Sequence, residues 1–177
     1  MVKIPMDLHD IQVLLAAELS VCQWLAEFMV EKLEFHSGAV EDFSASLING
    51  PDGEETILFE CSVNGEKYGA YLLVYNRFPE CPAERQLYYL RKIKRTYRCR
   101  EYKELKCCLI IPAWLLEQYP SLSEYPVIFL WESLCELLTE HQGRRGRYLA
   151  DILSKSSVGQ IPFYSYSSPG LVLEYCP

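Results

Sequence analysis

Nine of the chain's 17 basic residues fall in one short stretch, between Arg85 and Lys106. Only Glu101 and Glu104 oppose them, so the stretch has a net charge of +7 (nine minus two), and the remainder is −14 in a chain of net charge −7. Positive charge concentrated in this way suits phosphate groups, because Lys and Arg contacts release counterions from a nucleic acid and make its binding salt-sensitive. The alternative is a solvated helix face without a ligand.

The expected contacts to nucleic acid, DNA or RNA, are the basic residues in the middle of this stretch, helped by a second small cluster. They are Arg91, Lys94, Arg95 and Arg98, with Arg144 and Arg145 extending the surface. Tyrosines interleaved with the stretch can stack on unpaired bases, although we expect half of them to pack on a sheet. These are Tyr88, Tyr89, Tyr97 and Tyr102.

The eight cysteines form no C-x-x-C pair, and several lie inside apolar runs such as LFECSV and KCCLII. We interpret them as reduced core thiols, with a metal site or disulfides built from distant cysteines as the alternatives. The sequence has no G-x-S-x-G, P-loop or Rossmann glycine pattern. Its N-terminus carries acids where a signal peptide is apolar, and no apolar run reaches the roughly 20 residues of a membrane span. We therefore expect a cytoplasmic, globular chain without a membrane anchor.

Hydrophobic periodicity predicts an α/β (α+β) domain, as an αβββαβ core with a further strand and helix. A three-strand antiparallel meander is expected in a mixed sheet flanked by helices, since Asn64-Gly65 is a strong hairpin signal. The long link between the last two strands predicts a crossover and parallel neighbours. The expected helices cover 8–34, 83–105, 132–141 and 148–153, and the strands cover 39–48, 56–63, 67–78, 107–111 and 127–131. We expect one domain over 1–155 and a tail, 156–177, that packs on it or extends from it.

This order of elements over residues 8–141 resembles the PD-(D/E)XK (restriction-endonuclease-like) nuclease superfamily. The resemblance implies a site in which acids on neighbouring strands hold Mg²⁺ or Mn²⁺, which activates water. It assigns catalysis to Asp42, Glu60 and Lys67, the metal to Glu18, Asp42 and Glu60, and phosphate orientation to Gln86. Ser62 stands where the family has the lysine of E-x-K, and Lys67 compensates only if its side chain folds back.

A second register takes Pro51-Asp52 as the literal PD motif. The third strand should then carry E-x-K, but Tyr75-Asn76-Arg77 stands at the best-placed position and supplies no acid there.

Two classes of function follow. The first is a nucleic-acid-binding protein on a nuclease-like scaffold, either a divergent metal-dependent endonuclease or, the form we favour, a catalytically degenerate member. The second is a non-enzymatic adaptor with a protein partner, acidic and dimeric, similar to the secretion chaperones of bacterial type III systems. Trp114, Tyr119 and Trp131 would then supply an exposed apolar interface.

Overall fold

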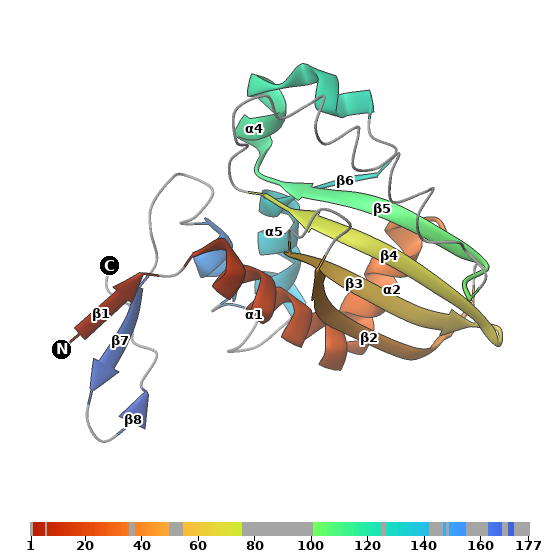
Figure 1. The fold of residues 1–177 in the computed structure, drawn as a ribbon, viewed down its shortest axis with the longest axis horizontal. Coiled ribbons are helices and arrows are strands. Elements are labelled where there is room, and N and C mark those ends of the chain that lie inside the picture. Colours follow the sequence, from red (N-terminus) through yellow and green to blue (C-terminus); the bar gives the residue numbers. More distant parts are fainter. Residues whose placement is uncertain are drawn as a thin grey trace.

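A five-stranded mixed sheet is the centre of the fold in the computed structural model (Figure 1). The structure describes residues 2–5, 7–35, 38–49, 55–75, 101–124, 127–141, 147, 149–154, 163–167 and 170–171. The strands follow one another in the sheet in chain order, as β2 (Val40–Asn49), β3 (Glu55–Val63), β4 (Glu66–Val74), β5 (Glu104–Ile111) and β6 (Ile128–Leu130). β2, β3 and β4 are antiparallel, whereas β4 with β5 and β5 with β6 are parallel. The α/β class, the meander and the parallel pairing of the last two strands are thus confirmed.

The β3–β4 hairpin turns at Asn64 and Gly65, as expected. Both residues have positive φ, 53° and 76°, which a two-residue turn of this kind requires and which these residue types tolerate. The turn sets the register, in which Ser62 is opposite Lys67 and Glu60 is opposite Gly69. Because residues directly opposite each other share a face of the sheet, this register decides which side chains of β3 and β4 meet.

Helices cover one face of the sheet, which we call the helix-covered face. They are α1 (Leu8–Val21), α2 (Gln23–Lys32), α5 (Trp131–His141) and the helical residues 149–154. Their apolar side chains join alternate residues of β3, including Ile57, Phe59 and Cys61, in the largest buried cluster. On the opposite face, α4 (Ala113–Gln118) and η1 (Pro120–Glu124) add Leu115 and Leu122 to a smaller cluster around Leu109. Alternation along each strand therefore assigns every side chain to one face or the other.

The single helix expected over 8–34 is wrong, because the chain breaks at Cys22 and α1 and α2 are bent by 101°. Cys22 has an extended backbone (φ −102°, ψ 102°) and caps both helices: its N–H donates to the main-chain oxygen of Glu18 in α1, and its own oxygen accepts from the N–H of Ala26 in α2. The periodicity runs through the break because both helices bury their apolar side chains in the same core. The expected cap at Asp7 is confirmed, and it forms a capping box with Asp10.

Within the described residues, no single helix has the length and apolar composition of a membrane span. Only the bent pair of α1 and α2 passes that test together.

Most of the expected basic helix, residues 83–100, lies outside the described residues, but its expected end is wrong. Residues 101–103 are not helical, and β5 begins at Glu104. Leu105 and Cys107 pack on the opposite face while Cys108 packs on the helix-covered face, which is the period-two pattern of a strand. Parallel pairing with β4 extends the strand beyond the apolar run that predicted it.

Trp131 was expected at the end of a strand and exposed, and both expectations are wrong. It begins α5, is 0% exposed, and its Nε1 donates to the main-chain oxygen of Ile110 at 3.0 Å. The core accepts this large side chain because the indole N–H finds an acceptor there. Of the apolar residues proposed for an interface, Trp114 is exposed and Tyr119 is partly buried.

A second sheet joins the two ends of the chain, which the sequence did not predict. Its strands are β1 (Val2–Pro5), β7 (Phe163–Ser167) and β8 (Gly170–Leu171), in the order β1-β7-β8. β1 and β7 are antiparallel, with Lys3 opposite Ser165. Figure 1 shows this small sheet apart from the five-stranded one, on the side where α1 begins.

Candidate functional site

Glu60 lies on the face opposite the helix-covered face. Its neighbours Phe59 and Cys61 join the helix-packed cluster, so alternation turns Glu60 the other way, as it does Leu58. The register places Ser44 on one side of Glu60 and Gly69 on the other. The Glu60 side chain is 26% exposed, so its carboxylate is half-buried and needs polar partners.

Lys67 supplies one of these partners. It lies opposite Ser62, one step along β3 on the face that Glu60 uses, and is therefore a diagonal neighbour of Glu60. Its Nζ is 2.8 Å from Oε1 of Glu60, and its side chain is 46% exposed. The lysine side chain thus folds back toward Glu60.

Tyr102 is the second partner, and reasoning from the sequence missed it. Its hydroxyl donates to the same Oε1 of Glu60 at 2.5 Å, and its ring lies 4.8 Å from the Nζ of Lys67. The ring also lies against Gly69, where a Cβ atom would come within 2.9 Å of Cε1 of Tyr102. A glycine inside a strand marks such close approaches, so Gly69 was the signal in the sequence.

We call Glu60, Lys67 and Tyr102 the Glu60 cluster. Because the Tyr102 ring already contacts Gly69 and Lys67, the base-stacking role expected for Tyr102 is not favoured.

The three groups of the Glu60 cluster stabilise one another's charge states. Burial alone would raise the pKa of Glu60, but hydrogen bonds from Lys67 and Tyr102 and the charge of Lys67 outweigh it and lower that pKa. The hydrogen bond to Glu60 raises the pKa of Lys67. Burial, followed by the bond to the Glu60 carboxylate, raises the pKa of the Tyr102 phenol. A carboxylate, an ammonium and a neutral phenol therefore persist around neutral pH, and general acid–base catalysis would need a group that titrates there.

The structure does not bring the three expected metal ligands together. Glu18 is buried on α1, whose apolar side chains join the cluster on the helix-covered face, whereas Glu60 lies on the opposite face. Asp42 is exposed, in a β-bulge of β2 where Glu41 and Asp42 together face Ser62. Among the residues that the structure describes, no group of three or more His, Cys, Asp or Glu is arranged to hold a metal ion. Glu18, Asp42 and Glu60 therefore do not form such a group of three.

The other expected site residues lie outside the described part of the chain. They are Asp52, Gln86, Arg91, Lys94, Arg95, Arg98, Arg144 and Arg145.

Two lysines of the basic stretch are described, and both have internal partners. Lys103 pairs with Glu66. Lys106 donates from Nζ to the main-chain oxygen of Leu33 at 2.5 Å, at the end of α2. A cation is favourable at a helix C-terminus because the free carbonyl groups there carry partial negative charge. These two lysines thus serve the fold.

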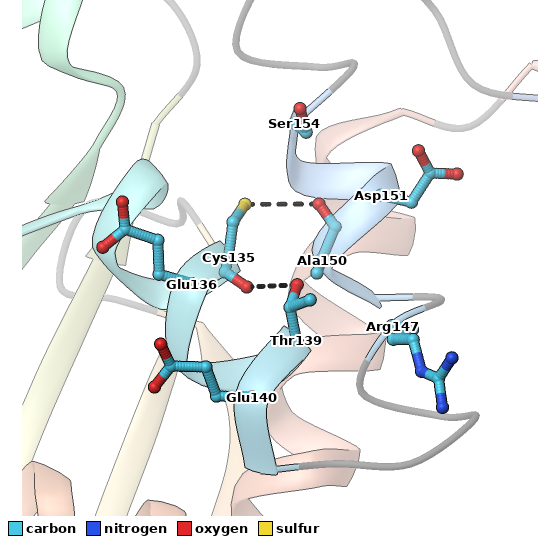
Figure 2. Close-up of a pocket in the computed structure, with 8 residues that line it drawn as sticks. All are labelled: Cys135, Glu136, Thr139, Glu140, Arg147, Ala150, Asp151 and Ser154. Carbon is cyan, nitrogen blue, oxygen red and sulfur yellow. Dashed lines mark hydrogen bonds between the residues drawn. The ribbon is translucent and has the colours of Figure 1, made fainter.

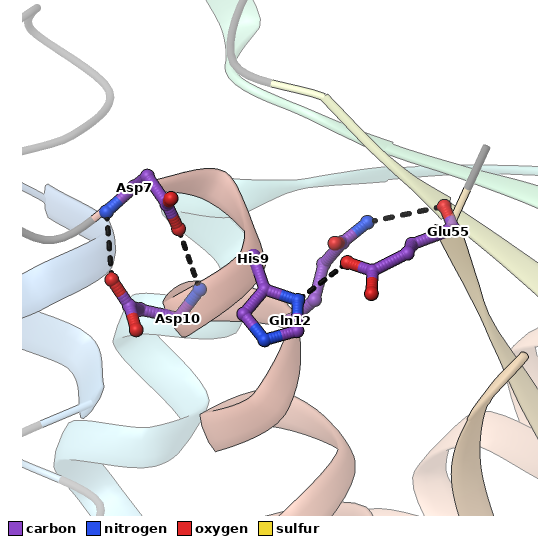
Figure 3. Close-up of polar contacts among 5 residues, drawn as sticks. All are labelled: Asp7, His9, Asp10, Gln12 and Glu55. Atoms are coloured by element: carbon purple, nitrogen blue, oxygen red, sulfur yellow. Dashed lines mark hydrogen bonds and ion pairs between the residues drawn. The ribbon is translucent and has the colours of Figure 1, made fainter.

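A second polar contact joins the first turn of α1 to the start of β3 (Figure 3). Nδ1 of His9 is 2.5 Å from Oε2 of Glu55, and Nε2 of Gln12 donates to the main-chain oxygen of Glu55 at 3.5 Å. The hydrogen bond to Glu55 and the charge of Glu55 raise the pKa of His9. The pair is exposed, and its partners lie 46 residues apart in sequence, so no local motif predicted it.

A pocket of about 490 Å³ lies between α5 and the helical residues 149–154, as Figure 2 shows. Its lining residues are Cys135, Glu136, Thr139, Glu140, Arg147, Ala150, Asp151 and Ser154. Sγ of Cys135 lies 3.2 Å from the main-chain oxygen of Ala150, and burial raises the pKa of this thiol to about 11. The thiol is therefore protonated near neutral pH and is a poor nucleophile.

Of these three places, the Glu60 cluster is the one that the sequence singled out and that the structure assembles. It combines a half-buried charge with two partners from different strands or loops. Comparison of the chain with models of protein families, with curated proteins and with solved structures found no match.

Proposed function

We propose that this chain is a nucleic-acid-binding protein on a PD-(D/E)XK nuclease-like scaffold whose catalytic site is degenerate. One observation carries the degenerate assignment: Lys67 and Tyr102 both bond the Oε1 atom of Glu60, the acid expected to hold the metal. A lysine ammonium therefore lies against this carboxylate, where a divalent ion would have to bind.

The physical argument concerns the space and the charge next to Oε1. Mg²⁺ binds carboxylate oxygens at about 2.0–2.1 Å and demands nearly octahedral geometry. With the ammonium 2.8 Å from Oε1, an incoming ion must displace Lys67 or lie close to it. A dication about 4 Å from the ammonium is repelled by about 2 kcal/mol in water and about 8 kcal/mol at the effective dielectric near a protein surface.

Binding itself is attributed to the basic stretch that precedes β5. The window between Arg85 and Lys106 has a charge of +7 in a chain that is otherwise −14, and such segregation suits a polyanion. Lys103 and Lys106 have internal partners, so Arg91, Lys94, Arg95 and Arg98 are the proposed phosphate contacts. Arg144 and Arg145 are proposed to extend the surface.

The adaptor function remains the second candidate, with a protein partner or a homodimer. Trp114, 39% exposed, is the observation in its favour. The parallel pairing of β5 with β6 is against it, because the chaperones that the sequence resembles were expected to join these strands by a short turn.

The experiment measures cleavage and binding together, using labelled single- and double-stranded DNA and RNA with Mg²⁺ or Mn²⁺. The wild type is expected to bind in a salt-sensitive manner and to leave the nucleic acid intact. A triple variant with Arg91, Lys94 and Arg98 changed to Glu should lose binding. Where weak binding to a duplex persists at low salt, the loss of three phosphate contacts should reduce the slope of log affinity against log salt by about 2–3.

The matched control reverses Lys3, Lys32 and Lys155 to Glu. It changes the net charge by the same amount but leaves the basic stretch intact, so its binding should stay close to that of the wild type. Equal losses in the two variants would attribute binding to net charge alone. Metal-dependent cleavage that disappears in Glu60→Ala would instead establish an active nuclease and overturn the degenerate assignment.

A further inference from the structure

β2 is the first strand of the five-stranded sheet, and among the described residues it has a neighbouring strand of that sheet only on its β3 side. Along an antiparallel strand, every second residue turns its N–H and C=O groups away from the neighbouring strand. Such a row of main-chain groups can pair with a strand of another molecule, and proteins commonly cover it. The main-chain groups on the outer edge of β2 therefore need hydrogen-bond partners other than β3.

Two polar side chains from the helices reach this outer edge. The main-chain N–H of Ala45 donates to Oγ of Ser20 at 3.1 Å. The same Oγ lies 2.8 Å from the main-chain oxygen of Ala45. Nε2 of Gln23 donates to the main-chain oxygen of Val40 at 3.0 Å. The N–H of Ala45 and the carbonyl of Val40 are thus bonded by side chains. The single hydroxyl proton of Ser20 is shared between the main-chain oxygens of Ala45 and Ala16, each 2.8 Å from Oγ.

The break at Cys22 makes this arrangement possible. Ser20 is in the last turn of α1 and Gln23 is the first residue of α2. In a continuous helix the two side chains, three positions apart, would lie only about 5–6 Å from each other. The two strand positions they bond are five residues apart, about 16 Å along an extended strand. The 101° bend directs the two side chains to these separate points, and Figure 1 shows α1 beside β2.

We propose that the α1–α2 corner, defined as Ser20 to Gln23, is a built-in cover over a strand-pairing surface on the outer edge of β2. The partner that the uncovered edge fits is β2 of a second copy, in antiparallel pairing about a two-fold axis. One strand then offers the same donors and acceptors to its copy, as an isologous interface requires. The ten-residue length of β2 suits such pairing.

The first test is amide hydrogen exchange at Ala45, measured by NMR. Ser20→Ala removes the acceptor for its N–H, and exchange there should become at least about tenfold faster. Ser46→Ala is the matched control, because Ser46 is an exposed serine on the same strand. Ser20→Thr keeps a hydroxyl and should restore protection. Equal exchange in Ser20→Ala and the wild type would overturn the proposal.

The second test is the molar mass in solution over a range of protein concentrations, measured by light scattering. The chain has a mass of 20.5 kDa, and Ser20→Ala combined with Gln23→Ala should shift toward twice that value at concentrations where Ser46→Ala does not. Gln23→Glu serves if the double variant fails to fold, because Gln23 is exposed and the change removes the donor to Val40, together with the hydrogen bond from Gln23 to Glu27. Faster Ala45 exchange without any gain in mass would overturn the second copy as partner. Both tests are made without nucleic acid, so neither depends on the proposed function.

Discussion

Replacing Gly69 by alanine tests whether the close approach of Tyr102 to β4 holds the Glu60 cluster together. A Cβ atom at this position would lie 2.9 Å from Cε1 and 3.1 Å from Cδ1 of Tyr102, and 3.0 Å from Cδ1 of Leu105. Carbon atoms in contact prefer about 3.5–4.0 Å, so the ring has to move by several tenths of an ångström. That movement would weaken the hydrogen bond from Tyr102 to Glu60.

The expected change in the free energy of unfolding follows from two opposing effects. Inserting one methyl group into a packed site costs about 1–3 kcal/mol. Alanine also restricts the unfolded chain more than glycine does, which recovers about 0.4–1 kcal/mol. We therefore expect Gly69→Ala to lower the free energy of unfolding by about 1–2 kcal/mol, measured by urea denaturation with an unchanged slope.

The decisive assay is a double-mutant cycle with Tyr102→Ala. Without the ring most of the clash is absent, so Gly69→Ala should cost about 0.5 kcal/mol or less in that background, a coupling of about 1 kcal/mol. Gly38→Ala is the control, because its Cβ would meet Asn64 and Val63 instead and should show no coupling to Tyr102. The same cost for Gly69→Ala in both backgrounds would refute the proposed contact.

Three further predictions concern single side chains. Tyr102→Phe removes one hydrogen bond that lowers the pKa of Glu60, so this pKa should rise in a carbon-detected NMR titration. A carboxyl group whose pKa is lower in the folded than in the unfolded state stabilises the fold above the unfolded pKa, and this stabilisation is lost as the pH falls through the folded pKa. In Tyr102→Phe the folded pKa of Glu60 is higher, so the stabilisation by Glu60 should be lost at a higher pH than in the wild type. His9→Gln should remove stability that is fully present below the usual histidine pKa near 6.5 and lost as pH rises through the raised folded value. Urea midpoints at about pH 5.5 and about pH 8.5 measure this effect, with Glu55→Gln expected to match it, and a loss that is independent of pH would contradict it. Trp131→Phe removes the indole N–H that donates to a main-chain oxygen of β5 and should lower the free energy of unfolding by about 1–3 kcal/mol, whereas Trp114→Phe at an exposed position should change it by less than about 0.5 kcal/mol.

The sequence by itself determined the features that depend on neighbouring residues. Asn64-Gly65 defined the β3–β4 hairpin, since few residue types tolerate positive φ. The alternation in β3 placed Glu60 on the face away from Phe59. The length of the link before β6 predicted the parallel pairing, because a tight turn cannot join parallel strands.

Only the tertiary structure decided the contacts between distant parts of the chain. Tyr102 reaches Glu60 across 42 residues, and Ser20 reaches Ala45 across 25. The break at Cys22 could not be predicted from hydrophobic periodicity. Periodicity indicates which residues are buried, and both helices bury their apolar side chains in one core. Trp131 lies inside because an acceptor on β5 satisfies its N–H. Each of these outcomes depends on which strands become neighbours, and periodicity along a single segment carries no information about that choice.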